Sequence, residues 1–398
     1  MGYQLPFLGL MPASAWVAPR LQDLPQDWSS IPRISLDVET KDPDLHELGC
    51  GARRDGCHVV GFAIAFDFGT GPANYKAYYL PIRHEDGGNM PNSSAVIRYL
   101  SGHFAAYNGR IVGAELSYDG DYIQQEGIVF ARHVPWFDVA TTDSLIYEYH
   151  DSYTLDSCAR RRSLPGKDER LLRNAASYYG ADNVKSIIYR LHAKYIGPYA
   201  EQDVLLPLLI DDAQREDIIA QGLGRAELLE ADVLPITVAM RRWGVRIDQD
   251  AFAQVMAWTN AKQTAYLAQF NHAVRLDLPV TMETLRSPFD MQKVMADLGL
   301  PLLPMTRKLD RKLGQYVDGQ PSLMAKTLKA YRDPRIDLLL QAKKLDKIIT
   351  TYGPSIEKYM VNGRIHGTLK SVRGSREGSD EDDDEQAGTI SRRFSHVH

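Results

Sequence analysis

The chain has 398 residues, of which 44% are hydrophobic and 24% charged, and its formal net charge is −5. This length predicts two domains, and the composition is typical of a globular protein. No apolar run approaches the roughly 18 residues of a membrane span, and no basic segment precedes the apolar N-terminal residues, so we expect neither a membrane partner nor a signal peptide.

The few cysteines of the chain give information on its cellular compartment and on possible metal binding. Cys50, Cys57 and Cys158 are the only ones in the chain, which favours a reducing compartment and predicts a cytoplasmic location. Cys50, Cys57 and His58 lie close together in the sequence, but a zinc site needs a fourth ligand and no matching pair exists. The acidic net charge neither supports nor excludes nucleic acid as a partner, because phosphate binding depends on local basic grooves.

The first part of the chain is rich in strand signals. Residues 1–32 contain many prolines and little periodicity, so we expect a lead-in segment that packs on the next domain. Strands are predicted where Val, Ile, Phe and Tyr gather between Gly, Pro and Asp, at residues 33–39, 58–66, 76–82 and 109–116. The spacing of apolar residues predicts a helix at residues 95–107.

Helical patterns dominate from residue 117 onward. Helices or short helical turns are predicted at residues 117–127, 139–149, 154–164, 168–180 and 183–195. Residues 197–223 form one longer predicted helix, in which Pro207 removes a backbone hydrogen bond and should produce a kink. Strands followed by helices on a mixed sheet predict an α/β domain at residues 33–223.

A second, mainly helical domain is predicted at residues 224–360. Its helical patterns, one of them ending at Gly244 before a short strand, lie at residues 225–248, 252–274, 287–301 and 334–353. Residues 303–322 are basic and read as an irregular segment. The polar tail from residue 361 contains an acidic run at residues 379–385, which is predicted to be a solvated loop.

Four carboxylates and a tyrosine form an ordered set along the α/β domain. Asp37 and Glu39 lie two apart on the first predicted strand, so their side chains share one face. Asp119 follows the fourth predicted strand, and Tyr199 and Asp203 lie one turn apart on the long helix. Taken singly, each has an ordinary explanation, such as a salt bridge, a helix cap or a half-buried tyrosine. The pattern as a whole, with about 80 residues between successive blocks, indicates a single site.

Carboxylates gathered at one place predict a particular chemistry. Two adjacent carboxylates repel each other unless a cation lies between them. Four oxygen-donor side chains suit two divalent cations, Mg²⁺ or Mn²⁺, which can clamp a phosphodiester, activate a water and stabilise the leaving oxygen. A tyrosine one turn from a ligand can orient that water, and its ordinary pKa of about 10 makes it a poor base.

These blocks resemble the three exonuclease motifs of the DEDDy class, and they are most similar to the proofreading domain of family A DNA polymerases. The three motifs correspond to ISLDVET (34–40), VGAELSYDGDYI (112–123) and YAEQDVLLPL (199–208). The resemblance implies an RNase H-like fold in which a mixed five-stranded sheet carries flanking helices. It also implies that Tyr199 acts on the attacking water and that the metal ligands are Asp37, Glu39, Asp119 and Asp203.

The second motif departs from the family pattern. Glu115 stands where the family commonly has an asparagine near the substrate strand, and Ser117 replaces a frequent lysine. Pro207 is unusual in the third motif. Asp121 is a nearby alternative to Asp119, although Tyr118-Asp119 fits the motif better. None of these departures removes a ligand, so we expect 3′→5′ exonuclease activity.

The rest of the chain resembles the polymerase portion of the same family. Residues 229–248 resemble the segment that follows the exonuclease, residues 333–369 the thumb helix and first palm strand, and residues 388–398 a stretch that precedes the palm core. The domain at 224–360 is therefore expected to be thumb-like, and residues 361–398 to be the incomplete start of a palm. The basic residues expected to contact DNA are Arg241, Arg242, Lys343, Lys344, Lys347 and Arg393.

The polymerising half of the family pattern is missing. The palm carboxylate motif, the fingers helix and the H-D-E-like motif do not occur in this sequence. The chain is therefore expected to bind a single-stranded DNA 3′ end and primer-template DNA, and to need a second chain with palm and fingers for polymerisation. A split gene, plausibly of a phage, and a truncated or interrupted reading frame explain the pattern equally well.

Two other functions remain open at this point. In one, the nuclease core is silent and the chain is a DNA-binding or assembly subunit; the intact carboxylate set argues against it. In the other, the chain is an exoribonuclease resembling RNase D, which shares the motifs. The L-P-x-x-x-x-M-x-x-x-G-V-x-I-D pattern at residues 234–248 argues against the second, because it is typical of the polymerase family.

Overall fold

The computed structural model describes residues 12–181, 183–274, 276–310, 315–370, 372 and 395–397. The chain divides into two compact units, Met1–Gly244 with His366–His398 and Val245–Ile365. Each unit is described by itself. Among the helices that lie in these residues, none combines the length and the apolar character that a membrane crossing requires.

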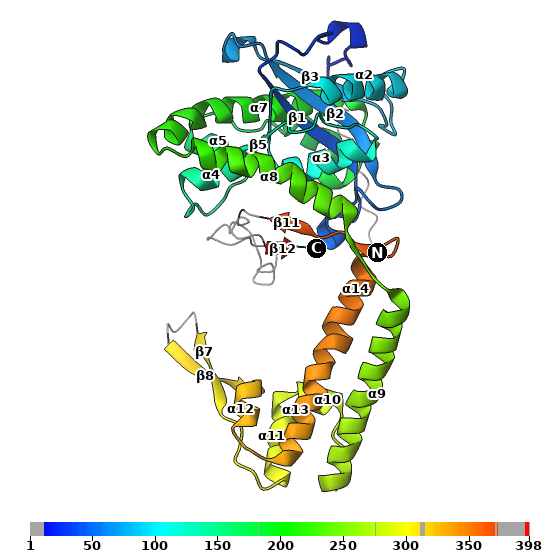
Figure 1. Cartoon of the computed structure of the whole chain (residues 1–398), viewed down its shortest axis with the longest axis vertical. Coiled ribbons are helices and arrows are strands. Elements are labelled where there is room, and N and C mark those ends of the chain that lie inside the picture. Colours follow the sequence, from blue (N-terminus) through cyan, green and yellow to red (C-terminus); the bar gives the residue numbers. More distant parts are fainter. Residues whose placement is uncertain are drawn as a thin grey trace. The chain divides into compact units, whose positions relative to one another are not determined.

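A mixed five-stranded sheet forms the centre of the first unit (Figure 1). Its strands are β1 (Arg33–Lys41), β2 (His58–Asp67), β3 (Lys76–Pro81), β4 (Arg110–Gly113) and β5 (Trp136–Asp138), in the order β3-β2-β1-β4-β5. The β1–β2 and β2–β3 pairs are antiparallel, and β4 joins both β1 and β5 in parallel. The α/β class and the mixed sheet expected from the sequence are thus confirmed, and the short β5 completes the predicted strand set.

Hydrophobic residues bury both faces of this sheet. Along β2, Phe62, Ile64 and Phe66 belong to one buried cluster, while Ala63 and Ala65 belong to another. This alternation follows from the two-residue period of a strand, which sends successive side chains to opposite faces. The first cluster includes side chains of α2 and α3, and the second includes side chains of α5, α6 and α7. The result is a sheet covered by helices on both sides.

Most helices of the first unit overlap the predicted segments, but α1 was not predicted, and one predicted helix is divided between two elements. They are α1 (Leu45–Leu48), α2 (Ser93–Ala106), α3 (Leu116–Gln125), α4 (Val139–Ile146), α5 (Leu155–Arg161), α6 (Arg170–Tyr178), α7 (Ala193–Ala220) and α8 (Gly224–Trp243), with short 3₁₀ turns η1 (Leu21–Asp23), η2 (Pro72–Asn74) and η3 (Lys185–Arg190). The divided helix is the one expected at residues 183–195. It is the turn η3 followed by the start of α7, since Leu191 and His192 adopt extended backbone angles.

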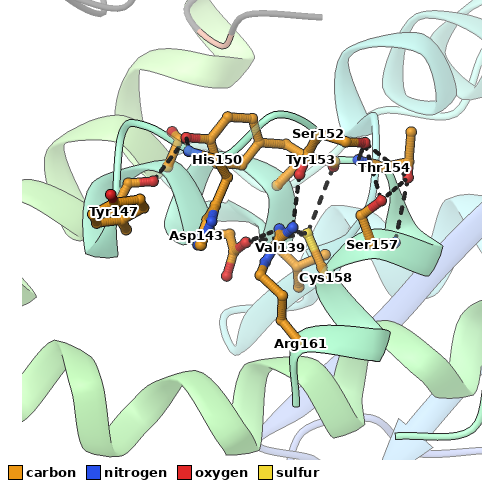
Figure 2. Close-up of polar contacts among 12 residues, drawn as sticks. Val139, Asp143, Tyr147, His150, Ser152, Tyr153, Thr154, Ser157, Cys158 and Arg161 are labelled. Carbon is orange, nitrogen blue, oxygen red and sulfur yellow. Dashed lines mark hydrogen bonds and ion pairs between the residues drawn. The ribbon is translucent and has the colours of Figure 1, made fainter. Parts of the chain in front are cut away.

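A buried ion-pair network joins α4, α5 and α7, and Figure 2 shows its α4–α5 side. Asp143 on α4 is fully buried and pairs with Arg161 and Arg162 at the end of α5. Gln214 on α7 donates a hydrogen bond to the same carboxylate at 3.3 Å. At the other end of α5, the Thr154 hydroxyl caps the helix by accepting from Ser157 N. The network fixes α5 against α7, which carries part of the site described below.

The helix α8 belongs to the first unit. It packs on α3, α4 and β5, and its residues Ala231 and Val238 lie in the two buried clusters of that unit. The unit boundary therefore falls at Gly244, where Gly244 has a φ of 65° and ends the helix. The sequence placed the boundary of its second domain at residues 223 and 224 instead, one helix earlier.

The second unit is built around two long helices. They are α9 (Gln249–Val274) and α13 (Pro334–Lys347), which pack on each other. Only α13 continues, through the π-helical turn η4 (Ile348–Tyr352), into α14 (Gly353–Tyr359). Shorter elements complete the unit: α10 (Met282–Arg286), α11 (Pro288–Asp297), α12 (Ala325–Lys329), and the small sheet of β6 (Val245–Arg246), β10 (Arg364–Ile365) and β9 (Met360–Val361). Its core includes Phe270, Leu285, Met295, Leu339 and Leu340.

The basic segment expected to be irregular contains a β-hairpin. Strands β7 (Met305–Asp310) and β8 (Gln315–Pro321) pair antiparallel. The sequence lacks the alternation of apolar and polar residues on which a strand prediction relies, because the described β8 side chains are mostly exposed.

In the first unit, β11 (Thr368–Lys370) pairs with β12 (Ser395–Val397). The predicted acidic loop at residues 379–385 lies outside the described residues.

Candidate active site

The central strand of the sheet carries the first two carboxylates of the predicted set. Asp37 and Glu39 lie on β1, which has β2 on one side and β4 on the other. Glu39 is buried and Asp37 is half-buried. The β1–β2 register shifts between Glu39 and Thr40, so the strand is irregular directly beside the carboxylates.

Asp119 reaches β1 from the first turn of α3. Its Oδ1 accepts a hydrogen bond from Val38 N at 3.3 Å, which places the carboxylate beside the backbone between Asp37 and Glu39. The side chain is buried, and its Oδ2 has no hydrogen-bond partner. A buried carboxylate oxygen without a donor is costly, so this atom is suited to a cation that the protein chain itself does not provide.

Tyr199 and Asp203 enter the site from α7. This helix lies across β1, β2, β3 and β4, and the four-residue spacing puts both side chains on one face. Both are buried, and Asp203 Oδ1 has no hydrogen-bond partner. The structure therefore brings the five predicted residues together beside the central strand, between β1, α3 and α7: Asp37, Glu39, Asp119, Tyr199 and Asp203.

Burial and mutual repulsion both act on the pKa values of these carboxyls. Burial, followed by the charge of Asp203, raises the pKa of Asp37 to about 7. Burial and the charges of Asp37 and Asp203 raise the pKa of Glu39 well above its usual range, and burial with the charge of Asp37 does the same for Asp119. The site thus gathers more negative charge than its own surroundings neutralise.

A lysine that sequence reasoning missed supplies one positive charge. The Nζ atom of Lys167 lies 2.8 Å from Asp203 Oδ2 and 3.5 Å from the Tyr199 hydroxyl. It also lies 5.5 Å from the centroid of the Tyr199 ring. Lys167 is 36 residues from Asp203 in a loop between α5 and α6. No periodicity or spacing in the sequence distinguishes it from other lysines.

Asp138 is a second residue that the predicted site did not include. At the end of β5 it caps α4 by accepting from Ala140 N and Thr141 N, and it also accepts from Leu116 N at the start of α3. Burial, followed by the charge of Glu115, raises its pKa to about 6. Asp138 therefore fixes the start of the helix that carries Asp119. In the sequence, Asp138 directly precedes the helix predicted at residues 139–149, a common position for a capping residue.

The donor set fits hard divalent cations in its chemistry. All candidate ligands are carboxylates, and two buried oxygens, Asp119 Oδ2 and Asp203 Oδ1, lack partners. Within the described residues, however, no group of three or more His, Cys, Asp or Glu side chains is arranged to hold one ion. Lys167 occupies the other oxygen of Asp203. The site is thus a cluster of carboxylates, one of which is paired with a lysine.

Two of the three arginines predicted to bind DNA, Arg241 and Arg242, are engaged within the first unit. Arg241 is 5% exposed and forms an ion pair with Asp121, while Arg242 pairs with the same carboxylate at 2.6 Å. These contacts attach α8 to α3. Arg241 presents very little accessible surface to a phosphate, so the structure favours a packing role for it over the predicted DNA contact.

The predicted basic residues of α13 differ from one another in exposure. Lys343 donates a hydrogen bond to Leu323 O at 2.8 Å, and burial lowers its pKa. Lys344 and Lys347 are exposed. Arg393 lies outside the described residues. Lys344 and Lys347 remain the predicted phosphate contacts that the structure leaves accessible.

Comparison with known sequences relates the whole chain to phage polymerases. No protein-family model matches it. The chain is 38% identical over 401 residues to a DNA-directed DNA polymerase of Pseudomonas phage M6, an alignment that covers 100% of this chain and 56% of that protein. It is 26% and 24% identical to proteins named DNA polymerase DpoZ from Salmonella phage PMBT28 and Acinetobacter phage SH-Ab 15497, over 64% and 59% of the chain and 40% and 39% of those proteins.

Comparison with solved structures shows a shared fold. The POL domain of Pol1 from M. smegmatis, solved in complex with DNA primer-template and dNTP, matches with a TM-score of 0.55 at 15% identity, over 92% of this chain and 51% of that chain. The fold and the relatives together define a polymerase-related protein. More particularly, the chain is similar in sequence to DNA polymerases of phages. It spans about half the length of the relatives that it matches.

Proposed function

We propose that the chain is the 3′→5′ exodeoxyribonuclease portion of a DNA polymerase, which removes the 3′-terminal nucleotide by hydrolysis of its phosphodiester. The observation that carries the proposal is the gathering of four carboxylates and a tyrosine from β1, α3 and α7 at one partly buried place. An uncompensated cluster of this kind suits a reaction on a phosphodiester assisted by divalent metal.

The carboxylates would hold the cations. Asp37, Glu39, Asp119 and Asp203 are oxygen donors suited to Mg²⁺ or Mn²⁺. Two such cations, when bound, supply an activated water and stabilise the leaving 3′ oxygen. The part of Asp138 is indirect, because it holds the N-terminus of the helix that carries Asp119.

Tyr199 orients the attacking water and does not remove its proton. Burial, followed by the negative charge of Asp203 and Glu39, raises the pKa of its hydroxyl well above the usual value. At neutral pH, the hydroxyl keeps its proton and offers a hydrogen bond. A general base needs a pKa near the working pH, so an orienting role fits this environment better.

The proposed substrate is the 3′ end of single-stranded DNA, and the proposed macromolecular partners are primer-template DNA and a polymerase chain with palm and fingers. Two findings support this assignment. The M. smegmatis POL domain that shares the fold was solved with primer-template DNA, and the chain covers only 56% of the Pseudomonas phage polymerase. Polymerisation would then depend on the complementary portion, while hydrolysis would need this chain alone.

The test uses a single-stranded oligonucleotide labelled at its 5′ end and incubated with Mg²⁺ or Mn²⁺. We expect stepwise shortening from the 3′ end, and we expect Asp203→Asn to lose nearly all of it. Asp217→Asn is the matched control, since Asp217 is an exposed residue on the same helix. Tyr199→Phe should slow cleavage by up to roughly 100-fold, as expected from lost orientation, and should leave Mn²⁺ binding intact.

Three outcomes would count against the proposal. If the wild-type chain shortens the oligonucleotide with neither metal, it lacks the proposed exonuclease activity. Equal rates for Asp203→Asn and the wild type would remove the carboxylate cluster from the reaction. Faster degradation of RNA than of DNA would move the substrate class to RNA.

A further inference from the structure

A lysine side chain occupies part of the carboxylate cluster. Lys167 Nζ lies 2.8 Å from Asp203 Oδ2, and the two side chains are 17% and 6% exposed. The other oxygen, Asp203 Oδ1, is buried without a partner. Asp203 therefore has one oxygen neutralised by the chain itself and one oxygen left without a hydrogen bond.

The backbone around Lys167 is held in place by three hydrogen bonds. Gln202, the residue before Asp203 on α7, accepts from Asp168 N at 3.0 Å and donates to Gly166 O at 3.1 Å. Lys167 N itself donates to Asp156 Oδ1 on α5 at 3.2 Å. Three consecutive residues are thus anchored to two helices. The position of the lysine follows from a fixed backbone and does not depend on the side chain alone.

The helices that supply these anchors are themselves fixed to one another. Asp143 on α4 binds Arg161 of α5 (Figure 2). It also binds Arg162, and Gln214 of α7 donates a hydrogen bond to it. The loop therefore spans two helices whose relative position a buried network maintains. This arrangement fixes the backbone of Lys167 beside α7, the helix that carries Asp203.

The ammonium group and a divalent cation would compete for the same carboxylate. Like charges within a few ångströms repel strongly in a partly buried site. The charge of Lys167 also lowers the pKa values of Asp37, Glu39 and Asp203, opposing the rise that burial causes. In the metal-free protein it thus performs part of the neutralisation that a cation would perform.

We propose that Lys167 is a built-in counter-ion of the metal-free nuclease site, which must leave Asp203 Oδ2 before a divalent cation binds there. Lys167 is a positioning residue in this scheme, and it sets the metal affinity of the site. The proposal rests on the proposed function to the extent that Asp203 is a metal ligand.

The test measures Mn²⁺ affinity of the full chain by isothermal titration calorimetry, independently of cleavage. Lys167→Met removes the competing charge and should bind Mn²⁺ about tenfold more tightly, which corresponds to roughly 1.4 kcal/mol. Lys185→Met is the matched control: Lys185 is exposed and acts on Asp37, Glu39 and Asp203 only through its charge. It should stay within about twofold of the wild type, the scale of a screened surface charge. Lys167→Arg should resemble the wild type.

Unchanged or weaker Mn²⁺ binding by Lys167→Met, at an unchanged circular dichroism spectrum, would overturn the proposal. If that variant fails to fold, Gln202→Ala takes its place, because it releases the loop and leaves the ammonium group intact. Gln202→Ala should also bind Mn²⁺ more tightly, and unchanged affinity there would overturn the proposal equally.

One further comparison separates this inference from the proposed function. If the wild type binds Mn²⁺ in a manner that Asp203→Asn abolishes, and Lys167→Met shows no gain, only the inference about Lys167 fails. If neither the wild type nor Lys167→Met binds Mn²⁺, the metal-dependent function and the inference fail together.

Discussion

At the scale of single residues, the carboxyl of Asp37 shows how the site opposes folding. Its pKa is raised to about 7, because burial and the charge of Asp203 disfavour the ionised form. An unfolded chain releases this proton near pH 4. Between about pH 4 and pH 7 the folded state therefore binds more protons than the unfolded state. The contribution of this carboxyl to the free energy of unfolding is therefore greatest below about pH 4 and falls as the pH rises to about 7.

We expect Asp37→Asn to raise the thermal stability of the metal-free protein at pH 8 and to change it little at pH 4.5. The amide cannot ionise, so the penalty that develops with rising pH disappears. A gain of about 3 °C at pH 8 corresponds to roughly 1 kcal/mol for a domain of this size. Differential scanning calorimetry in EDTA measures it, with the exposed Asp232→Asn as control. A variant whose melting temperature falls at pH 8 would contradict this account.

The sequence predicts a shared position most directly for candidate site residues that lie on one element. The spacing of Asp37 and Glu39 on a strand, and of Tyr199 and Asp203 on a helix, determines a common face before any fold is known. Lys167 is different, since it meets Asp203 only because a loop is attached to α5 and α7. Arg241 is a similar case, because its charge predicted a contact with DNA phosphate, whereas the structure pairs it with the buried Asp121.

At the scale of elements, the junction between β4 and α3 carries backbone strain. Glu115 has a φ of 60° and a ψ of 32°, which is the left-handed region that disfavours most side chains. Its charge also raises the pKa values of Asp119 and Asp138. Asparagine, the residue that the exonuclease family commonly has here, tolerates this conformation better and carries no charge.

We therefore expect Glu115→Asn to stabilise the protein by about 1 kcal/mol, the lower end of the usual cost of a left-handed residue. Glu115→Gln is the matched control, because it removes the charge and keeps the longer side chain. Urea denaturation of the metal-free protein should give the order Asn, then Gln, then wild type. Equal stability of the two variants would show that the backbone conformation contributes nothing.

Elements with a clear hydrophobic period were predictable, and those without one were not. The alternation of large and small residues along β2 reflects two buried sheet faces, so the strand stands out in the sequence. The hairpin β7–β8 buries few of its described side chains and gives no such signal. The unit boundary at Gly244 depends on the packing of α8 onto α3 and β5, a tertiary contact that the local sequence pattern does not contain.

At the scale of the whole molecule, the charge distribution bears on how DNA would be held. The net charge is −5, so any DNA binding must come from a local basic surface. Of the predicted contacts, Lys344 and Lys347 lie exposed on α13 of the second unit. Lys347 Nζ also lies 5.3 Å from the centroid of the Tyr352 ring. A lysine beside an exposed aromatic ring suits contact with a nucleic acid backbone and its bases.

We expect the double variant Lys344→Gln/Lys347→Gln to bind primer-template DNA more weakly than the wild type, and to show a shallower dependence on salt. Each phosphate contact on duplex DNA contributes about 0.9 to the slope of log K against log salt concentration, so two lost contacts should reduce the slope by about 1.8. Fluorescence anisotropy at several salt concentrations measures both quantities. Lys293→Gln serves as control, since Lys293 is exposed on α11 and already paired with Asp290. Cleavage of single-stranded DNA should persist in the double variant, because the carboxylates lie in the other unit. An unchanged slope would show that the DNA-binding surface does not include these two lysines of α13.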